Sequence, residues 1–297
     1  MRTRFATTFA TVAAGLATTL SLTACGSAAD GTSGKPSVVA STNVWGDIAA
    51  TVAGPDAAVE SIITDPAADP HSHETSAVES AKIMDADLVV YNGGGYDEFM
   101  EKAVAGKDKR AVDAFASRAD DIRDDDNEHV WYDVDTVAVV ADKIAAALGE
   151  IDPEHATAYT DRAAALRDQL NSIRSYTTPF ATSDPGTPIM QTEPLAHYLL
   201  LDAGTEDLTP REYQEAIEQE TDPAPAAVAA ARDLVTNKQV RLMVYNVQTE
   251  DKTSKELRAQ AEAAGIPVVE VTETLPAGVD YVTWQTANAR AIASAVD

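Results

Sequence analysis

The sequence predicts an α/β protein with two lobes, each a mostly parallel sheet flanked by helices, joined by one long central helix. Two observations carry this prediction. Short β-branched runs alternate with helical patterns along the 297-residue chain, which is typical of parallel sheets with crossover helices. One unbroken helical pattern near the middle of the chain separates two such series. The length suits one large domain or two of ordinary size.

The predicted strands are short and mostly apolar, as expected of strands that are covered on both faces. They are residues 37–40, 58–63, 88–91, 188–192, 240–245 and 267–271. Helical patterns fill the intervals between them. Ser76 and Glu79, for example, have capping-box spacing ahead of a helix that we expect to run through Asp85.

The central helix is predicted from Pro153 to about Thr177, where apolar residues recur at steps of three and four. Asp152 would cap it ahead of a proline at the first helical position. We therefore expect an N-terminal α/β lobe over 37–150, a linking helix over 151–182 and a C-terminal α/β lobe over 183–297.

The first residues have the features of an export signal. Arg2 and Arg4 precede a run without charge from Phe5 to Ala29, which is rich in Thr and Ala and therefore inserts poorly as a transmembrane anchor. The end of this run, Leu22-Thr23-Ala24-Cys25, resembles the lipobox of bacterial lipoproteins. We expect a signal peptide over 1–24, a lipid on Cys25 and a flexible tether over 25–36.

Composition excludes several classes of protein. With 48 acidic and 22 basic residues the net charge is −26, which argues against binding to nucleic acid or to anionic lipid headgroups. The single Cys excludes a disulfide framework and a cysteine-rich zinc site. The acidic excess has two interpretations. It either serves solubility or indicates that the partner is a cation. The acidic run 124–126, within the loop 119–128, either gathers cations or is a solvated loop.

The five histidines are the first candidates for metal ligands, since neutral imidazole suits zinc and iron, whereas carboxylates suit Mn²⁺. His71 and His73 point to opposite sides of an extended backbone, so we expect at most one of them to ligate. Glu193 and His197 are four residues apart. On a helix this pair would be either a chelate or a surface contact.

Common catalytic motifs are missing from the sequence. It has no His-Glu-x-x-His zinc-protease motif and no Gly-x-Ser-x-Gly nucleophile elbow. The glycines at 93–95 lack the Lys and the Ser or Thr that complete a phosphate-binding loop.

Taken in order along the chain, several short motifs resemble those of the metal-binding lipoproteins of bacterial ABC importers, the zinc and manganese type of solute-binding protein. The resemblance runs from about Val38 to the end of the chain. It is carried by 38–43, Asp69-Pro70-His71, 86–93, His129-Val130-Trp131, Thr192-Glu193, 245–248 and 271–276. Each motif is weak alone, whereas their order and spacing are specific.

The resemblance implies four metal ligands, which are His71, His129, Glu193 and Glu273. This chain departs from the family pattern at three places. His73 stands where the family often has an aromatic residue, Glu128 where it often has Pro, and Glu273 where manganese members often have Asp. His73 and His197 therefore stay as alternative ligands.

The resemblance also implies a function, that of a receptor and not an enzyme. Two neutral imidazoles and two carboxylates around a divalent ion sum to zero charge, which limits the cost of burying it. We expect a monomer, anchored outside the bacterial cytoplasmic membrane through Cys25, that delivers Zn²⁺ or Mn²⁺, with Fe²⁺ after them, to an ABC permease transmembrane subunit. Two alternatives stay open, a secreted zinc hydrolase that uses the same residues and a cell-surface adhesion or structural lipoprotein.

Overall fold

A computed structural model of the chain describes residues 34–296, except 120–121, 123–125 and 220. The chain divides into two compact units, Met1–Gly34 and Lys35–Asp297, and the fold below is that of the second. The predicted signal peptide, Cys25, most of the predicted tether and two residues of the acidic run 124–126 lie outside the described residues.

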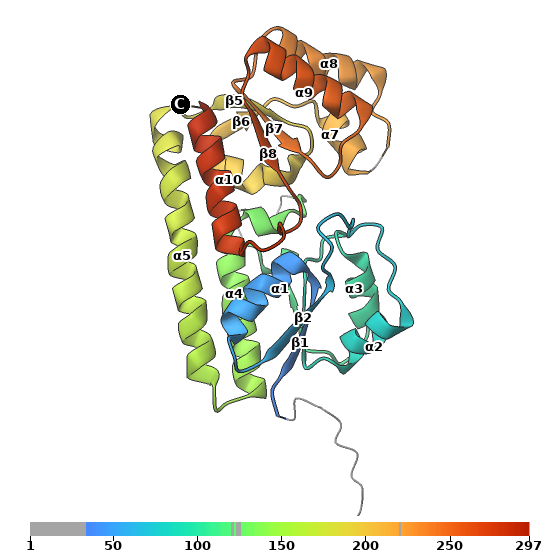
Figure 1. Ribbon diagram of the computed structural model, residues 1–297, viewed down its shortest axis with the longest axis vertical. Coiled ribbons are helices and arrows are strands. Elements are labelled where there is room, and N and C mark those ends of the chain that lie inside the picture. Colours follow the sequence, from blue (N-terminus) through green and yellow to red (C-terminus); the bar gives the residue numbers. More distant parts are fainter. Residues whose placement is uncertain (1–33, 120–121, 123–125, 220, 297) are drawn as a thin grey trace, which may run out of the picture. The chain divides into compact units, whose positions relative to one another are not determined.

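The N-terminal half of this unit, which we call the N-lobe, is built on a sheet of four parallel strands in the order β2-β1-β3-β4 (Figure 1). The central strand β1 pairs with both β2 and β3, so that Val38 lies beside Val59 and Leu88. The strands are β1 Ser37–Thr42, β2 Ala58–Ile63, β3 Leu88–Tyr91 and β4 Ala111–Asp113. The helices between them are α1 Asn43–Ala53, α2 Ala77–Asp85 and α3 Glu98–Val104, followed by a 3₁₀ turn, η1 Phe115–Ser117.

The C-terminal half, the C-lobe, repeats this topology with the parallel order β6-β5-β7-β8. Its strands are β5 Thr187–Gln191, β6 Thr205–Asp207, β7 Leu242–Asn246 and β8 Val268–Val271. Its helices are η4 Pro194–Ala196, α6 His197–Asp202, α7 Arg211–Glu218, α8 Pro225–Thr236, α9 Lys252–Ala264 and α10 Tyr281–Val296. The fold is thus the predicted α/β class with two parallel sheets.

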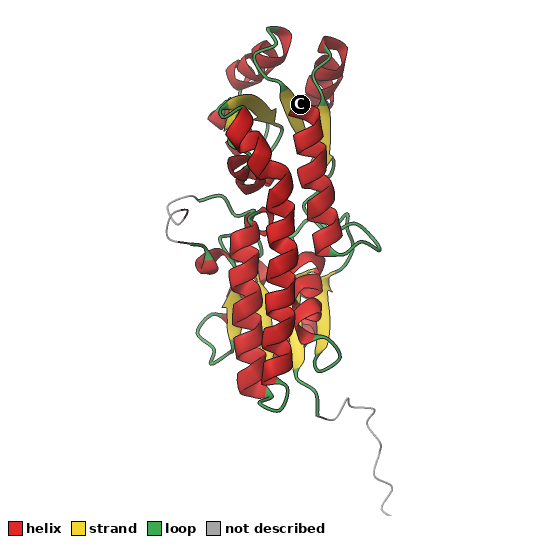
Figure 2. Cartoon of the chain, turned by 90° about the vertical axis from the view of Figure 1, so that its left-hand side faces the viewer, coloured by secondary structure: helices red, strands yellow, loops and turns green. Residues whose placement is uncertain are grey.

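Two long helices connect the sheets, α4 Val134–Ile151, which follows the 3₁₀ turn η3 Val130–Tyr132, and α5 Ala156–Ser183. Helix α5 packs against α4 and α1 beside the first sheet, and against α10 and α6 beside the second (Figure 2). The predicted long helix is therefore confirmed, with 28 residues.

Both ends of α5 differ from the prediction. Asp152 does not cap its start, because it ends α4 and its carboxylate accepts hydrogen bonds from the side chains of Tyr159 and His155. At the other end the helix continues past Pro179. Proline removes one backbone hydrogen bond from a helix, but the buried side chains of Thr177 and Phe180 on either side of it keep this segment packed.

All six predicted strands are present within one or two residues at each end, and the predicted capping box of Ser76 and Glu79 is formed. Strands β4 and β6 were not predicted. Each has three residues and lies at the edge of its sheet, too short for a recognisable pattern.

The largest apolar core runs through both lobes. It contains residues of β1, α1, α4 and α5 in the N-lobe together with residues of β5, β7 and α10 in the C-lobe. Smaller cores lie on the other face of each sheet, under α2 and α3 in the first and under α7, α8 and α9 in the second. Because one core is shared, we expect the lobes to move little relative to each other. No helix in the described part of the chain is both long enough and apolar enough to span a bilayer.

Arg162 of α5 fixes the end of α1. Its guanidinium donates to the carbonyls of Val52 at 2.7 Å and Ala53 at 2.8 Å, and to Asp56 Oδ2 at 2.9 Å. These bonds satisfy carbonyls that a helix C-terminus leaves without intrahelical partners. Gly54, with φ of 56°, lets the chain turn beneath the guanidinium, where a Cβ would lie 2.9 Å from it.

We predict that Arg162→Ala lowers the free energy of unfolding by about 2 kcal/mol, since it leaves two carbonyls and one carboxylate without their charged donor. Urea denaturation of the purified protein measures this change. Arg167→Ala on the same helix is the matched control. Arg167 forms an exposed ion pair with Asp142, so its loss should cost below about 1 kcal/mol. Equal losses in the two variants would contradict this account.

Candidate metal centre

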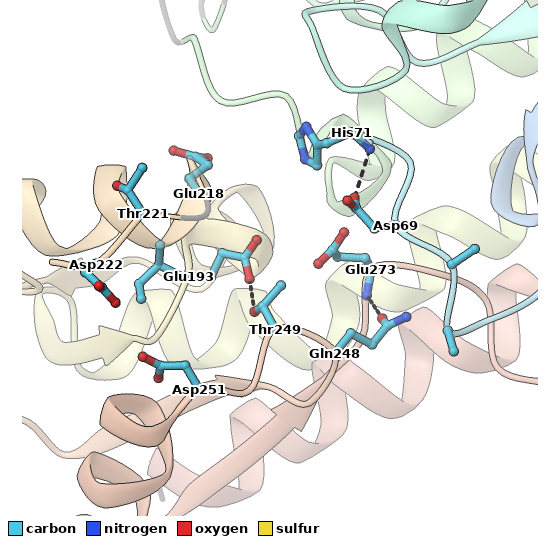
Figure 3. A pocket seen from close by; sticks show the side chains of 13 residues that line it. Asp69, His71, Glu193, Glu218, Thr221, Asp222, Gln248, Thr249, Asp251 and Glu273 are labelled. Carbon is cyan, nitrogen blue, oxygen red and sulfur yellow. Dashed lines mark hydrogen bonds between the residues drawn. The ribbon is translucent and has the colours of Figure 1, made fainter. Parts of the chain in front are cut away.

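The four predicted ligands all follow the carboxyl ends of parallel strands, which is where open α/β sheets place their binding sites. His71 follows β2, His129 follows β4, Glu193 follows β5 and Glu273 follows β8. Three of them line a cavity of about 280 Å³ at the junction of the lobes, together with carboxylates of both lobes. Figure 3 shows the carboxylates of Glu193 and Glu273 pointing into the space that His71 faces.

His71 lies on the loop between β2 and α2. The carboxylate of Asp69 accepts a hydrogen bond from the His71 backbone N–H at 2.9 Å, which fixes the turn Asp69-Pro70-His71. The imidazole packs edge-on against Tyr96, with 4.8 Å between ring centroids, and is 28% exposed. This histidine is therefore held by the N-lobe and open to the cavity.

His129 is completely buried. Its backbone N–H donates to Asn127 Oδ1 at 2.9 Å, and its Nδ1 lies 3.2 Å from the same oxygen. Its Nε2 is buried and has no hydrogen-bond partner among the described residues. Burial lowers the pKa of His129 to about 3, with smaller contributions from the neighbouring histidines. The ring is therefore neutral at physiological pH, and a neutral nitrogen is the form that binds a metal.

Glu193 and Glu273 are both buried, and one side chain holds them together. Nδ2 of Asn246, the last residue of β7, donates to Glu193 at 2.6 Å and to Glu273 at 2.8 Å. The Thr249 hydroxyl also donates to Glu193. Burial, and then the charge of Glu193, raise the pKa of Glu273 to about 8. Ionising both carboxyl groups without a nearby cation is therefore energetically unfavourable.

Two further acids join the site. Glu128 Oε1 lies 3.9 Å from His71 Nε2, and Glu218 Oε1 lies 4.0 Å from His129 Nδ1. Among the described residues, Glu128, His129 and Glu218 each offer a ligand atom within 4.8 Å of the others. Burial raises the pKa of Glu128 to about 7 and that of Glu218 to about 8, with Glu193 adding to both shifts.

Only one of these two acids, Glu128, could be noticed as unusual in the sequence. Glu128 is visible as a departure from the family pattern beside His129. Glu218 comes from α7, far from the other site residues in the sequence, and no local motif marks it. Only the fold reveals that it lies beside His129.

The two alternative ligands do not line the cavity, although His197 lies near enough to His129 to contribute to the lowering of its pKa. The His73 ring packs against Phe99 with 4.7 Å between centroids, and its Nε2 is 3.6 Å from Glu79. Glu193 and His197 do not share a helix face, because Glu193 is extended and His197 begins α6. Within the described part of the chain, neither histidine lines the cavity.

Residues 38–295 match the model of a protein family described as ZnuA, the periplasmic component A of a zinc-uptake complex. The chain belongs to the ZnuA family. This match covers both lobes and all four predicted ligands, and members of the family are metal-binding receptors of ABC importers.

Curated relatives in the ZnuA family bind different metals according to their names. The manganese-binding lipoprotein MntA of Bacillus subtilis is 28% identical over 172 residues, 54% of this chain and 56% of that protein. This alignment therefore spans about half the length of that relative. The iron-binding protein YfeA of Yersinia pestis is 26% identical over 241 residues, 78% of this chain and 76% of that protein.

Solved structures show the same fold. The periplasmic zinc-binding protein TroA of Treponema pallidum superposes with a TM-score of 0.74 at 20% identity, covering 89% of this chain and 99% of that one. The arrangement of two lobes with parallel sheets is therefore shared with this zinc-binding protein.

We predict that Asn246→Ala lowers the free energy of unfolding of the metal-free protein by about 2 kcal/mol. The substitution removes a buried donor and leaves two buried carboxylates without it. Thermal and urea unfolding after treatment with a chelator measure the change. The control Asn171→Ala replaces an exposed amide on α5 and should change stability by less than about 0.5 kcal/mol. An Asn246 variant as stable as the control would show that the amide does not hold the pair.

Proposed function

We propose that this protein is an extracytoplasmic receptor that binds one divalent transition-metal ion at the junction of its lobes and delivers it to an ABC permease. The ligands in this proposal are His71 and His129 from the N-lobe and Glu193 and Glu273 from the C-lobe. The observation that carries it is the pair of buried carboxylates on the single amide of Asn246, in a cavity that His71 enters from the other lobe.

The charges of the site support a cation as the ligand. The described residues that line the cavity include six acids and no Lys or Arg. Two carboxylates with two neutral imidazoles would neutralise a divalent ion in a place where each uncompensated charge is costly. The neutral His129 ring, whose Nε2 has no hydrogen-bond partner in the described part of the chain, supplies a nitrogen ready to ligate.

The proposed ligand set suits binding and release of a metal ion better than it suits catalysis. Four protein ligands form a closed shell, whereas a catalytic zinc site usually keeps one position open for water. The proposal is therefore a transport receptor without enzymatic activity, in keeping with the rest of the ZnuA family. The cavity favours neither the hydrolase nor the adhesion or structural lipoprotein. One protein of similar fold, the laminin-binding protein Lmb of Streptococcus agalactiae, is described as both an adhesin and a metal transporter, so adhesion there accompanies metal transport and does not replace it.

Delivery places the protein beside a membrane permease. ZnuA-family proteins are the periplasmic component of a metal-uptake complex, which implies a permease as the partner that receives the metal. The lipobox at Cys25 supports anchoring to the outer face of the cytoplasmic membrane, and we propose that the receptor acts there as a monomer. Incorporation of labelled palmitate into the expressed protein, and its loss in Cys25→Ala, tests the anchor.

Metal content tests the central part of the proposal. We expect close to one equivalent of metal per chain by mass spectrometry, and a large rise in melting temperature when Zn²⁺ or Mn²⁺ is added after chelation. A ligand at about 1,000 times its Kd stabilises the native state by about 4 kcal/mol. Titration calorimetry with the two ions then ranks them. No binding tighter than micromolar for any transition metal would contradict the proposal.

Substitution of single ligands tests their assignment. We predict that Glu273→Ala lowers the affinity for metal by at least about 100-fold, because it removes one ligand and one negative charge. The matched control is His197→Ala, a nearby potential ligand outside the proposed set, which should keep the affinity of the unmodified protein. The opposite outcome, with loss in the His197 variant alone, would overturn the assignment.

A further inference from the structure

The four proposed ligands reside on four separate segments, two from each lobe, and the described hydrogen bonds show how these segments are tied together. Two side-chain amides both bridge the lobes and bond the backbone of a proposed ligand, Asn127 of the N-lobe and Gln248 of the C-lobe. A third amide, Asn43 of the N-lobe, bonds the backbone of Leu275, two residues beyond Glu273. Neither Asn127 nor Gln248 was singled out as a ligand, and each uses both ends of its amide.

Gln248 follows β7 and holds the turn that carries Glu273. Its Oε1 accepts from the backbone N–H of Glu273 at 2.5 Å and from that of Thr274 at 3.3 Å (Figure 3). Its Nε2 crosses to the N-lobe and donates to the carbonyl of Pro66, and it also donates to the Thr274 hydroxyl at 2.8 Å in its own lobe. The Thr274 hydroxyl donates in turn to the same Pro66 carbonyl at 2.8 Å. Pro66 belongs to the loop after β2 that leads to His71. Gln248 therefore joins the segment of Glu273 to the segment of His71.

Asn127 makes the reciprocal connection from the N-lobe. Its Oδ1 accepts from the backbone of His129 at 2.9 Å and faces the imidazole Nδ1 at 3.2 Å. Its Nδ2 crosses to the C-lobe and donates to the carbonyl of Pro194 at 2.9 Å, the residue next to Glu193. The Tyr198 hydroxyl donates to the Asn127 carbonyl at 2.7 Å and adds a second bond across the junction. Asn127 therefore joins the segment of His129 to that of Glu193.

We propose that Asn127 and Gln248 are two inter-lobe latches that hold the ligand segments together and set the rate at which a bound metal ion leaves. This inference rests on the proposed function. In each latch the amide oxygen positions one ligand inside its own lobe, and the amide N–H closes onto the opposite lobe. Each proposed ligand lies on a segment that one of the two bridges ties to the other lobe. The lobes separate at the site only after both N–H bonds break, together with the bonds of Thr274, Tyr198 and Asn43 that cross the same junction.

Other hydrogen bonds also cross the junction. Tyr132 donates to the carbonyl of Thr272, beside Glu273, at 2.8 Å, and Tyr281 donates to the Trp131 carbonyl at 2.6 Å, among buried aromatic rings. Both donors belong to the shared core. The two latches differ from these bonds because their amide oxygens also bond the backbone N–H of a proposed ligand.

The acid variants Gln248→Glu and Asn127→Asp separate the two ends of each latch. Each keeps the oxygen that positions the ligand within its own lobe and removes the N–H that crosses to the other. Each also adds negative charge beside the site, which by Coulomb attraction alone slows the departure of a cation. A latch predicts the opposite, faster release.

The measurement is stopped-flow release of Mn²⁺ or Zn²⁺ from the loaded purified protein into excess chelator. We expect release to be about fivefold to tenfold faster in each variant, the equivalent of one lost hydrogen bond. We expect the association rate constant to change by less than about twofold, because variants of one binding site differ in affinity mainly through their dissociation rate constants. Gln239→Glu and Asn171→Asp, at exposed positions, are the matched controls and should release metal at the rate of the unmodified protein.

Unchanged or slower release in both latch variants, with metal still bound, would overturn the latch and leave the proposed function intact. An unmodified protein that holds no metal would instead overturn the proposed function, and the latch with it. Thr274→Val gives an independent test if an acid variant fails to fold. It removes the other hydrogen bond to Pro66 and should also accelerate release, whereas an unchanged rate would count against the latch.

Discussion

Uncompensated negative charge at the junction of the lobes is the constraint on which the rest of the structure depends. Glu193 and Glu273 are buried and share one neutral amide, which donates hydrogen bonds but supplies no positive charge. Within the described residues that line the cavity there is no Lys or Arg to compensate them. Burying such charges is expensive unless an opposite charge is close, and a divalent cation is the simplest one that fits between two carboxylates and two imidazoles.

The fold brings these groups together through its parallel sheets. Each proposed ligand lies on a segment that follows the carboxyl end of a strand, and residues of both lobes line the same cavity. The core shared along α5 limits how far the lobes can separate. Capture and release then depend on small movements of the loops and on the bonds that tie them, which is where Asn127 and Gln248 act.

Much of this arrangement could be predicted from the sequence. The features that could not be predicted depend on contacts between residues that are distant in the chain. Strand patterns and the long helix are local, and the motifs around His71 and His129 are contiguous. The apolar pattern of α5 stops at about Thr177, whereas the helix continues to Ser183 because tertiary packing of Phe180 overrides the effect of Pro179. Glu218 and the bridge from Gln248 to Pro66 join residues far apart in the chain, and no local pattern encodes such contacts.

The most direct test of a cation bound by both lobes is anomalous X-ray diffraction from crystals of the metal-loaded protein, with data collected at the absorption edge of the bound ion. The account predicts one strong anomalous peak within ligand distance of His129 Nε2, His71, Glu193 and Glu273. A peak held by Glu128 and Glu218 without Glu193 and Glu273 would contradict it, as would crystals of loaded protein with no peak at the junction.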